Sequence, residues 1–158
     1  MCLAAQLTGS LLTLPAIRSG WYGGLVKPSF NPPAWLFGPV WTALYFIMAV
    51  AAWTVWKRGS DAGRVKPALL LFFTQLVFNV LWSALFFGMR RPGLALAEIV
   101  LLWLLILATV LAFYGISRPA VWLLLPYLGW VFFAAVLNGT IWWLNRGGPG
   151  SGLPGAPF

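Results

Sequence analysis

The sequence contains no histidine, a single cysteine and only two acidic residues among 158. Without histidine, and with no second acid near Glu98, the only acid in an apolar stretch, it offers no proton relay or general acid–base pair. It also lacks metal-ligand clusters, phosphate-binding loops and nucleophile–base constellations. The lone Cys2 cannot form an intrachain disulfide. We therefore predict no metal site and no obligatory cofactor.

Charge is scarce as well. Charged residues make up 8% of the chain and hydrophobic residues 61%, whereas a soluble domain carries roughly 25% charged residues. A helix needs about 20 residues to cross a ~30 Å hydrocarbon layer. We therefore predict an all-α, multi-pass integral membrane protein: a five-transmembrane-helix bundle in one domain, residues 1–146. The spans are 2–17, 35–56, 67–88, 93–114 and 119–143, with a lid loop at 18–34 and a flexible Gly/Pro-rich tail at 147–158.

The net charge of +8 does not indicate nucleic-acid binding. The basic residues lie at span ends, where headgroup attraction and snorkelling favour them, and they form no cluster on one face. With five spans they divide five against five between the two sides of the membrane, so the orientation stays open. They are Arg18, Lys27, Arg90, Arg91 and Arg146 on one side and Lys57, Arg58, Arg64, Lys66 and Arg118 on the other.

The connections between spans are short. Loops 89–92 and 115–118 are so brief that the last three helices should be antiparallel neighbours. Three prolines are expected near the first turn of a span, where a missing N–H costs least: Pro67, Pro92 and Pro119.

Polar residues in the 67–88 span share one helical face. Gln75, Asn79, Trp82 and Phe86 recur at i, i+4, i+7 and i+11. A buried amide costs several kcal/mol unless it is hydrogen-bonded, so this face should point into the bundle. Interhelical hydrogen bonding and ligand contact remain equal alternatives for Asn79, while hydrogen bonding is favoured for Gln75.

The 119–143 span has the same construction, with Tyr127, Trp130, Ala134 and Asn138 at i, i+3, i+7 and i+11. An aromatic ring, a small residue and an amide on one face can form the floor of a flat pocket. The 35–56 span adds an inward aromatic pair one turn apart. That pair is Trp41 and Tyr45.

Five other tryptophans lie near span ends. We assign them to the aromatic belt at the membrane interface rather than to a site. They are Trp53, Trp56, Trp122, Trp142 and Trp143.

Glu98 is a candidate functional residue because acids are rare inside membrane spans. It lies only about two turns into its helix, so the favoured interpretation is snorkelling or an ion pair with Arg90 or Arg91.

Pairs of small residues spaced four apart permit close helix approach, within the bundle or between protomers. They are Ala5/Gly9, Ala84/Gly88 and Ala135/Gly139.

The most distinctive segment is an aromatic, proline-rich loop that leads into the second span. It reads Trp21-Tyr22-Gly23-Gly24-Leu25-Val26-Lys27-Pro28-Ser29-Phe30-Asn31-Pro32-Pro33, followed by Trp35, Pro39, Trp41 and Tyr45. Together with Asn79-Val80-Leu81-Trp82 and Leu125-Pro126-Tyr127-Leu128-Gly129-Trp130, it resembles the TspO/translocator protein family, also called tryptophan-rich sensory proteins or peripheral-type benzodiazepine receptors. The resemblance covers about residues 3–145 and is closest to bacterial members.

The resemblance implies a homodimeric five-helix bundle in a bacterial membrane that binds porphyrins and, in many members, sterols and isoquinoline or benzodiazepine ligands. The ligand would lie beneath the first loop. The ligand-binding positions carried over are Trp21, Tyr22, Trp41, Tyr45, Asn79, Trp82, Trp130 and Ala134. The family's light-dependent porphyrin breakdown is attributed to tryptophans that correspond to Trp41 and Trp130.

One departure concerns sterols. The family's sterol segment has a tyrosine and then a basic residue where this chain has Gly139 and Trp143, which puts high-affinity sterol binding in doubt.

Three functions fit the sequence. The favoured one is a membrane receptor or sensor for protoporphyrin IX and related tetrapyrroles, since flat aromatic faces suit a planar macrocycle. Lys27 and Arg18 would meet its propionates. The alternatives are a transporter of tetrapyrroles or sterol-like amphiphiles and a light-dependent porphyrin-degrading enzyme.

Overall fold

The computed structural model describes residues 4–9, 11, 13, 19–58 and 62–146, and these form helices and short connections with no strand. Residues 4–9, 11 and 13 are helical. The later helices are α2 (Trp21–Gly24), α3 (Ala34–Trp56), α4 (Ala62–Ser83), the π-helix η2 (Ala84–Gly88), α5 (Pro92–Tyr114) and α6 (Arg118–Asn145).

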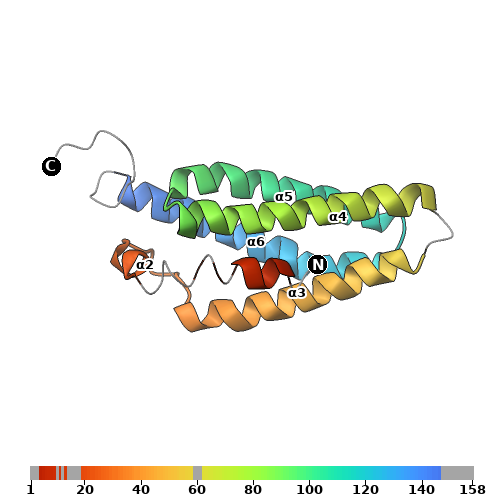
Figure 1. Cartoon of the computed structure of the whole chain (residues 1–158), viewed down its shortest axis with the longest axis horizontal. Coiled ribbons are helices and arrows are strands. Elements are labelled where there is room, and N and C mark those ends of the chain that lie inside the picture. Colours follow the sequence, from red (N-terminus) through yellow and green to blue (C-terminus); the bar gives the residue numbers. More distant parts are fainter. Residues whose placement is uncertain (1–3, 10, 12, 14–18, 59–61, 147–158) are drawn as a thin grey trace.

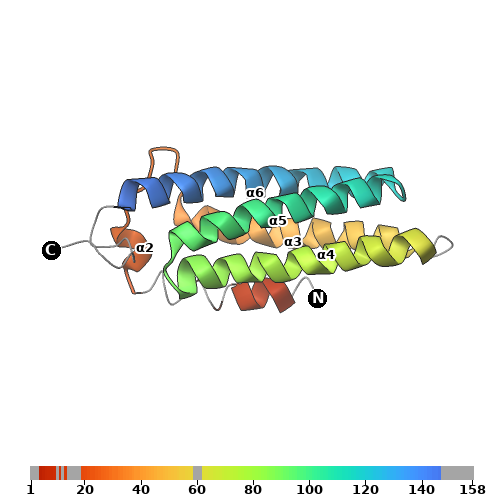
Figure 2. The same ribbon diagram turned by 90° about the horizontal axis from the view of Figure 1, so that it is seen from above.

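The four long helices run side by side along the longest axis of the molecule (Figures 1 and 2). Helix α5 packs between α4 and α6, and α3 packs on α6, whereas α3 and α4 have far fewer contacts with each other. The first helical segment lies at this gap: Gln6 Nε2 donates to Thr42 Oγ1 of α3 at 2.8 Å, and Gly9 lies against Ser83 of α4. The short connections do make α4, α5 and α6 successive neighbours, as predicted.

Among the described residues, four helices are long and apolar enough to cross a membrane. The predicted spans 35–56, 93–114 and 119–143 agree with α3, α5 and α6 to within two residues. The predicted 2–17 span falls partly outside the described residues, so the count of five is not established. Cys2, Arg18 and the 147–158 tail also lie outside them.

Helix α4 begins earlier than predicted. Its first residue is Ala62, so Pro67 is the sixth residue of the helix and not a first-turn residue. Gly63, Arg64 and Lys66 in this added turn are exposed. Solvent can therefore satisfy the carbonyl whose hydrogen bond the proline ring removes. At its other end α4 passes directly into η2, a wider coil that re-aims the side chains after Ser83.

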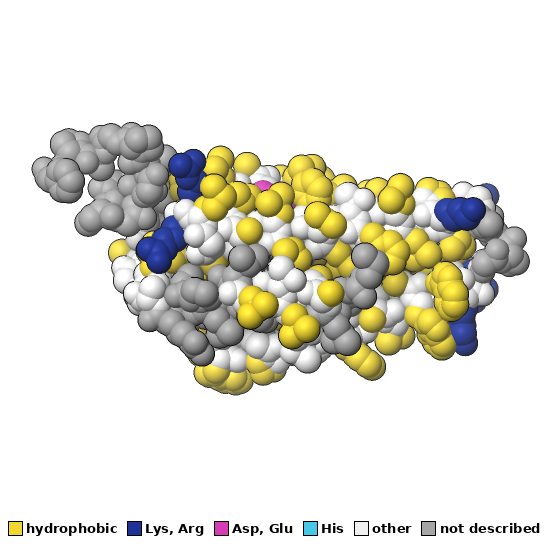
Figure 3. Space-filling model, in the orientation of Figure 1, with side chains coloured by type: hydrophobic (Ala, Val, Ile, Leu, Met, Phe, Trp, Pro, Cys, Tyr) yellow, Lys and Arg dark blue, Asp and Glu magenta, His cyan; other side chains and the backbone are white. Residues whose placement is uncertain are grey.

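The outer surface of the bundle is apolar between two charged ends. Exposed leucines, valines and aromatics cover the helices, and Lys and Arg gather near both ends (Figure 3). At those ends, Lys57 Nζ lies 3.9 Å from the Trp53 ring centroid and the Arg146 guanidinium 3.2 Å from that of Trp143. Trp142 differs from the other belt residues. It is half-buried, because its indole packs against Gly93, where an added Cβ would come within 2.8 Å of Nε1.

The predicted environment of Glu98 is wrong. Its side chain is only 7% exposed, and neither carboxyl oxygen has a hydrogen-bond partner among the described residues. The Arg90 guanidinium instead donates to Ser19 Oγ at 3.3 Å and lies over the Trp21 ring. Glu98 shares its buried helix face with Ala95 and Leu102, and this face turns the carboxyl between helices instead of toward the headgroups.

We expect Glu98→Gln to leave the thermal midpoint unchanged or to raise it. The amide keeps the shape of the side chain but removes an ionisable group that no described cation compensates. Thermal unfolding in detergent would measure this, with Glu98→Ala as the companion that leaves a cavity and lowers Tm. A fall of more than about 4 °C for Glu98→Gln would contradict it, because that loss is worth a kcal/mol or more.

Two of the small-residue pairs are used inside the bundle. Gly9 lies against Ser83. A Cβ added at Gly139 would lie 3.5 Å from the side chain of Leu96. No described atom comes within 4 Å of a Cβ added at Gly88. Of the three glycines, Gly88 is therefore the one with open space at its Cβ position among the described residues.

Candidate functional site

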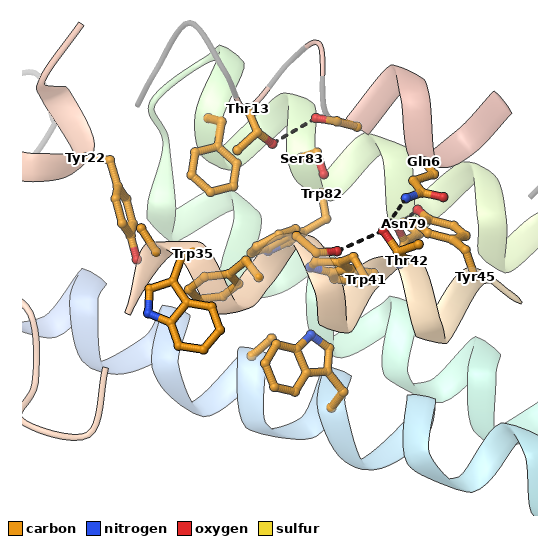
Figure 4. A pocket seen from close by; sticks show the side chains of 17 residues that line it. Gln6, Thr13, Tyr22, Trp35, Trp41, Thr42, Tyr45, Asn79, Trp82 and Ser83 are labelled. Atoms are coloured by element: carbon orange, nitrogen blue, oxygen red, sulfur yellow. Dashed lines mark hydrogen bonds between the residues drawn. The ribbon is translucent and has the colours of Figure 1, made fainter. Parts of the chain in front are cut away.

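A cavity of about 550 Å³ lies between the first helical segment, α3, α4 with η2, and α6 (Figure 4). Its volume falls within the range of small-molecule sites. Tyr22 of α2 lies at the end of the cavity nearest the lid loop (Figure 4). The lining residues are Gln6, Gly9, Thr13, Tyr22, Ala34, Trp35, Phe37, Gly38, Trp41, Thr42, Tyr45, Asn79, Trp82, Ser83, Phe87, Trp130 and Ala134.

The fold brings together most of the residues carried over from the family pattern. Those that line the cavity are Tyr22, Trp41, Tyr45, Asn79, Trp82, Trp130 and Ala134. Trp21 is not among the lining residues. Its ring packs edge-on against Phe86 at 6.0 Å and lies under the Arg90 guanidinium at 5.9 Å. Trp21 thus attaches the lid loop to η2 and the connection that follows it.

A chain of hydrogen bonds beneath the cavity joins three helices. The Tyr45 hydroxyl donates to Asn79 Oδ1 at 2.6 Å, and Asn79 Nδ2 donates to the Tyr127 hydroxyl at 3.0 Å. Tyr127 donates in turn to Gln75 Oε1 at 2.7 Å. Gln75 therefore has the interhelical role predicted for it. Asn79 also has an interhelical role, because it holds α3 to α6. It lines the cavity as well, so ligand contact stays a prediction for it.

A second polar contact fixes the ring of Trp82. Its Nε1 donates to Asn138 Oδ1 at 3.1 Å, and Asn138 Nδ2 donates to the carbonyl of Pro92 at 2.8 Å. The Trp82 ring also stacks on Phe86 with centroids 5.4 Å apart. Held by the hydrogen bond and the stacking contact, this indole presents a fixed face to the cavity. Its inward position agrees with the helix faces that helical spacing predicted to point into the bundle.

The remaining walls are aromatic. Trp41 lies 5.7 Å from Tyr45 and 6.4 Å from Tyr127, measured between ring centroids. On the α6 side, the Trp130 ring lies 6.0 Å from Phe37, and its buried Nε1 meets no hydrogen-bond partner in the part of the chain that the structure describes. Among the described residues, eight aromatic side chains line the cavity and no acidic or basic residue does. Such a site suits the flat, uncharged body of a ligand.

The lid loop is folded back on itself beside the cavity. The Tyr22 hydroxyl donates to Asn31 Oδ1 at 3.2 Å. Burial raises the pKa of Tyr22 above its usual value of 10.0, with the Asn31 hydrogen bond opposing, so the hydroxyl is protonated at neutral pH. Lys27 Nζ lies 4.7 Å from the centroid of the Tyr22 ring and donates to the carbonyls of Gly23 and Leu25 at 3.2 Å each.

Several lining residues were missed by the sequence reasoning. Trp35 and Gly38 precede Trp41 and Tyr45 on the same helical face, and Ser83 and Phe87 follow Asn79 at i+4 and i+8, so helical spacing could have found them. No such signal exists for Gln6 and Thr13, because their spacing does not indicate that the first segment packs against α3 and α4.

Comparison with known proteins shows the family of the chain. The sequence model of the TspO/MBR family matches residues 1–144. The chain is 50% identical over 145 residues to the tryptophan-rich protein TspO of Chlorobaculum tepidum, covering 92% of this chain and 91% of that protein. It is 41% identical to the tryptophan-rich sensory protein of Cereibacter sphaeroides, over 94% and 89% of the two chains. It is 39% identical to the translocator protein of Sus scrofa, over 96% and 92%.

The match covers the first helical segment, the lid loop and every long helix, and therefore all the elements that line the cavity. The four apolar helices agree with the membrane location of the family. The protein is thus a multi-pass integral membrane protein that belongs to the TspO/MBR family.

Proposed function

We propose that this protein is a membrane receptor that binds protoporphyrin IX and related tetrapyrroles in the cavity beneath the lid loop. We further propose that the first segment completes the cavity as a fifth membrane-spanning helix and that ligand binding has a regulatory, stress-linked role. The observation that carries the proposal is the cavity itself: eight aromatic side chains, no described charged group and a volume of about 550 Å³.

The chemistry of the ligand explains this choice. A porphyrin is a broad, planar, apolar macrocycle whose faces stack on aromatic rings and whose propionates need cationic or N–H donors. Trp41, Trp82 and Trp130 supply the faces. With no described charge inside, the propionates would point toward the lid loop, where Lys27 is found. Arg18, the second candidate, lies outside the described residues.

The first test is a titration of the purified, detergent-solubilised protein with protoporphyrin IX, followed by tryptophan quenching. We expect saturable binding that the double variant Trp41→Phe/Trp130→Phe weakens about tenfold, since the smaller phenyl face loses part of a stacking contact worth about 1 kcal/mol at each site. The control is Trp53→Phe/Trp122→Phe, which removes two exposed tryptophans. Equal, non-saturating quenching in all three proteins would mean partitioning into the micelle and would overturn the proposal.

One observation favours a second function, light-dependent degradation of the bound porphyrin. Trp41 and Trp130 both line the cavity, where they would meet the macrocycle. Trp130→Phe should then abolish product formation under illumination while porphyrin still binds. Product that does not exceed the amount from free porphyrin in wild-type protein would rule this function out.

Transport has less support here. Glu98, the acid that could couple movement to protons, does not line the cavity. Net flux of porphyrin in proteoliposomes would establish transport nevertheless. For isoquinoline, benzodiazepine or sterol-like ligands we propose the same cavity. For sterols the reason is that Gly139, in the segment where the family pattern places the sterol site, is packed against Leu96 within the bundle. For a homodimer we propose the Ala84/Gly88 face.

A further inference from the structure

The last turn of α6 holds the lid loop through one side chain. Asn145 Oδ1 accepts the Val26 N–H at 3.0 Å, and Asn145 Nδ2 donates to the Val26 carbonyl at 2.9 Å. A single carboxamide thus pairs with both backbone polar groups of one lid residue, as a neighbouring strand would. The two residues are 119 positions apart in sequence.

The carboxamide is fixed on its own helix. Asn145 Nδ2 also donates to the Ile141 carbonyl one turn earlier at 2.8 Å, and the side chain is only 8% exposed. Both protons of the amide are therefore used in hydrogen bonds, which fixes the orientation of the carboxamide. Asn145 is thus held by its own helix and does not have to be ordered when the lid closes.

Adjacent contacts extend this attachment toward the cavity. Leu25 is buried in a cluster with Phe86, Leu137 and Ile141, directly before the paired Val26. Lys27, directly after it, bonds back to Gly23 and covers the Tyr22 ring. Tyr22 lines the cavity. Displacing Val26 would therefore move the side chain at the lid end of the cavity.

We infer that Asn145 is the latch of the lid: its pairing with Val26 holds the loop closed over the cavity and sets how fast a ligand enters and leaves. Asn145 touches no cavity surface, so it is a positioning residue and not a binding residue. The inference rests on the proposed function in one respect, that the ligand passes beneath this loop.

The variants are Asn145→Ala, which removes both lid bonds, and Asn145→Asp, which can still accept from Val26 but no longer donates to its carbonyl. The control is Leu144→Ala, an exposed neighbour on the same turn of α6. Two measurements are made on each protein. One is hydrogen exchange of the Val26 amide without ligand, and the other is stopped-flow quenching with protoporphyrin IX.

We expect the Val26 amide to exchange roughly ten- to thirtyfold faster in Asn145→Ala, the factor expected for two lost hydrogen bonds. Association and dissociation of the porphyrin should both accelerate, about tenfold, while Kd changes less than either rate. Asn145→Asp should also exchange and bind faster than wild type. Leu144→Ala should match wild type in both measurements.

A purely structural role for Asn145 would lower Tm and weaken binding without raising the association rate. That result, or unchanged Val26 exchange in Asn145→Ala, would overturn the latch. Faster exchange with unchanged porphyrin rates would show that Asn145 holds the loop but that the ligand enters elsewhere, which overturns the gating role. If wild type binds no porphyrin, the proposed function and the gating role fail together, while Val26 exchange still decides whether Asn145 holds the loop.

Discussion

Replacing Ala134 with phenylalanine should weaken protoporphyrin IX binding by about a hundredfold or more, a loss of about 2.8 kcal/mol, while the helices stay folded. The Ala134 side chain is 8% exposed and lines the cavity on the α6 side. Because Ala134 lines the cavity, we expect a phenyl ring at this position to extend into the empty volume. It therefore occupies the space a macrocycle needs without the strain of overpacking.

The matched control for this variant is Val136→Phe, which adds the same ring two residues later on the exposed face of α6. It should bind like wild type, because the new ring faces lipid. Titration of the three proteins, each checked by circular dichroism, makes the comparison. If Ala134→Phe binds as tightly as wild type, the porphyrin does not lie in this cavity.

The largest stability effect is expected at Asn79. Asn79→Leu keeps a similar volume but removes the acceptor of the 2.6 Å bond from Tyr45 and the donor of the 3.0 Å bond to Tyr127. Losing these two buried hydrogen bonds should cost about 2 kcal/mol, at about 1 kcal/mol for each bond. For a chain of this size that corresponds to a fall in Tm of roughly 4–8 °C.

Thr74→Val is the control for Asn79→Leu. It removes a hydroxyl from the same helix, but this hydroxyl donates to the Leu70 carbonyl one turn earlier in that helix. Its Tm should lie within about 1 °C of wild type, since that bond joins no second helix. A Tm for Asn79→Leu equal to that of the control would mean that the hydrogen-bonded chain does not hold α3, α4 and α6 together.

Helical spacing predicted the inward faces well, because a buried amide leaves a membrane helix few choices. Gln75 and Asn79 needed hydrogen-bond partners inside the bundle, and both bond to the Tyr127 hydroxyl. Tyr127 lies on the α6 face that spacing with Trp130 and Ala134 had predicted to point inward. The ends of α3, α5 and α6 also followed from length and apolar composition. These features depend only on local periodicity and on the cost of exposing polar groups to lipid.

The features that the sequence did not predict depend on contacts between distant segments. Nothing near Asn145 indicates a bond to Val26, because the partners meet only when the lid loop folds over α6. Trp21 was expected in the cavity from the family pattern, but it is not among the lining residues. Its position could not be checked by helical spacing, because loop residues follow no period that would turn them inward or outward. Glu98 was assigned to the interface from its depth in α5. It is buried nevertheless, because it lies on the face of α5 that packs against the other helices.

The most direct measurement is an experimental structure of the protein with protoporphyrin IX bound. The macrocycle should lie between Trp41 and Trp130, close to Ala134, with its propionates toward the lid loop. Ligand density on the lipid-facing surface, or an empty cavity at saturating porphyrin, would contradict the claim that this aromatic cavity is the binding site.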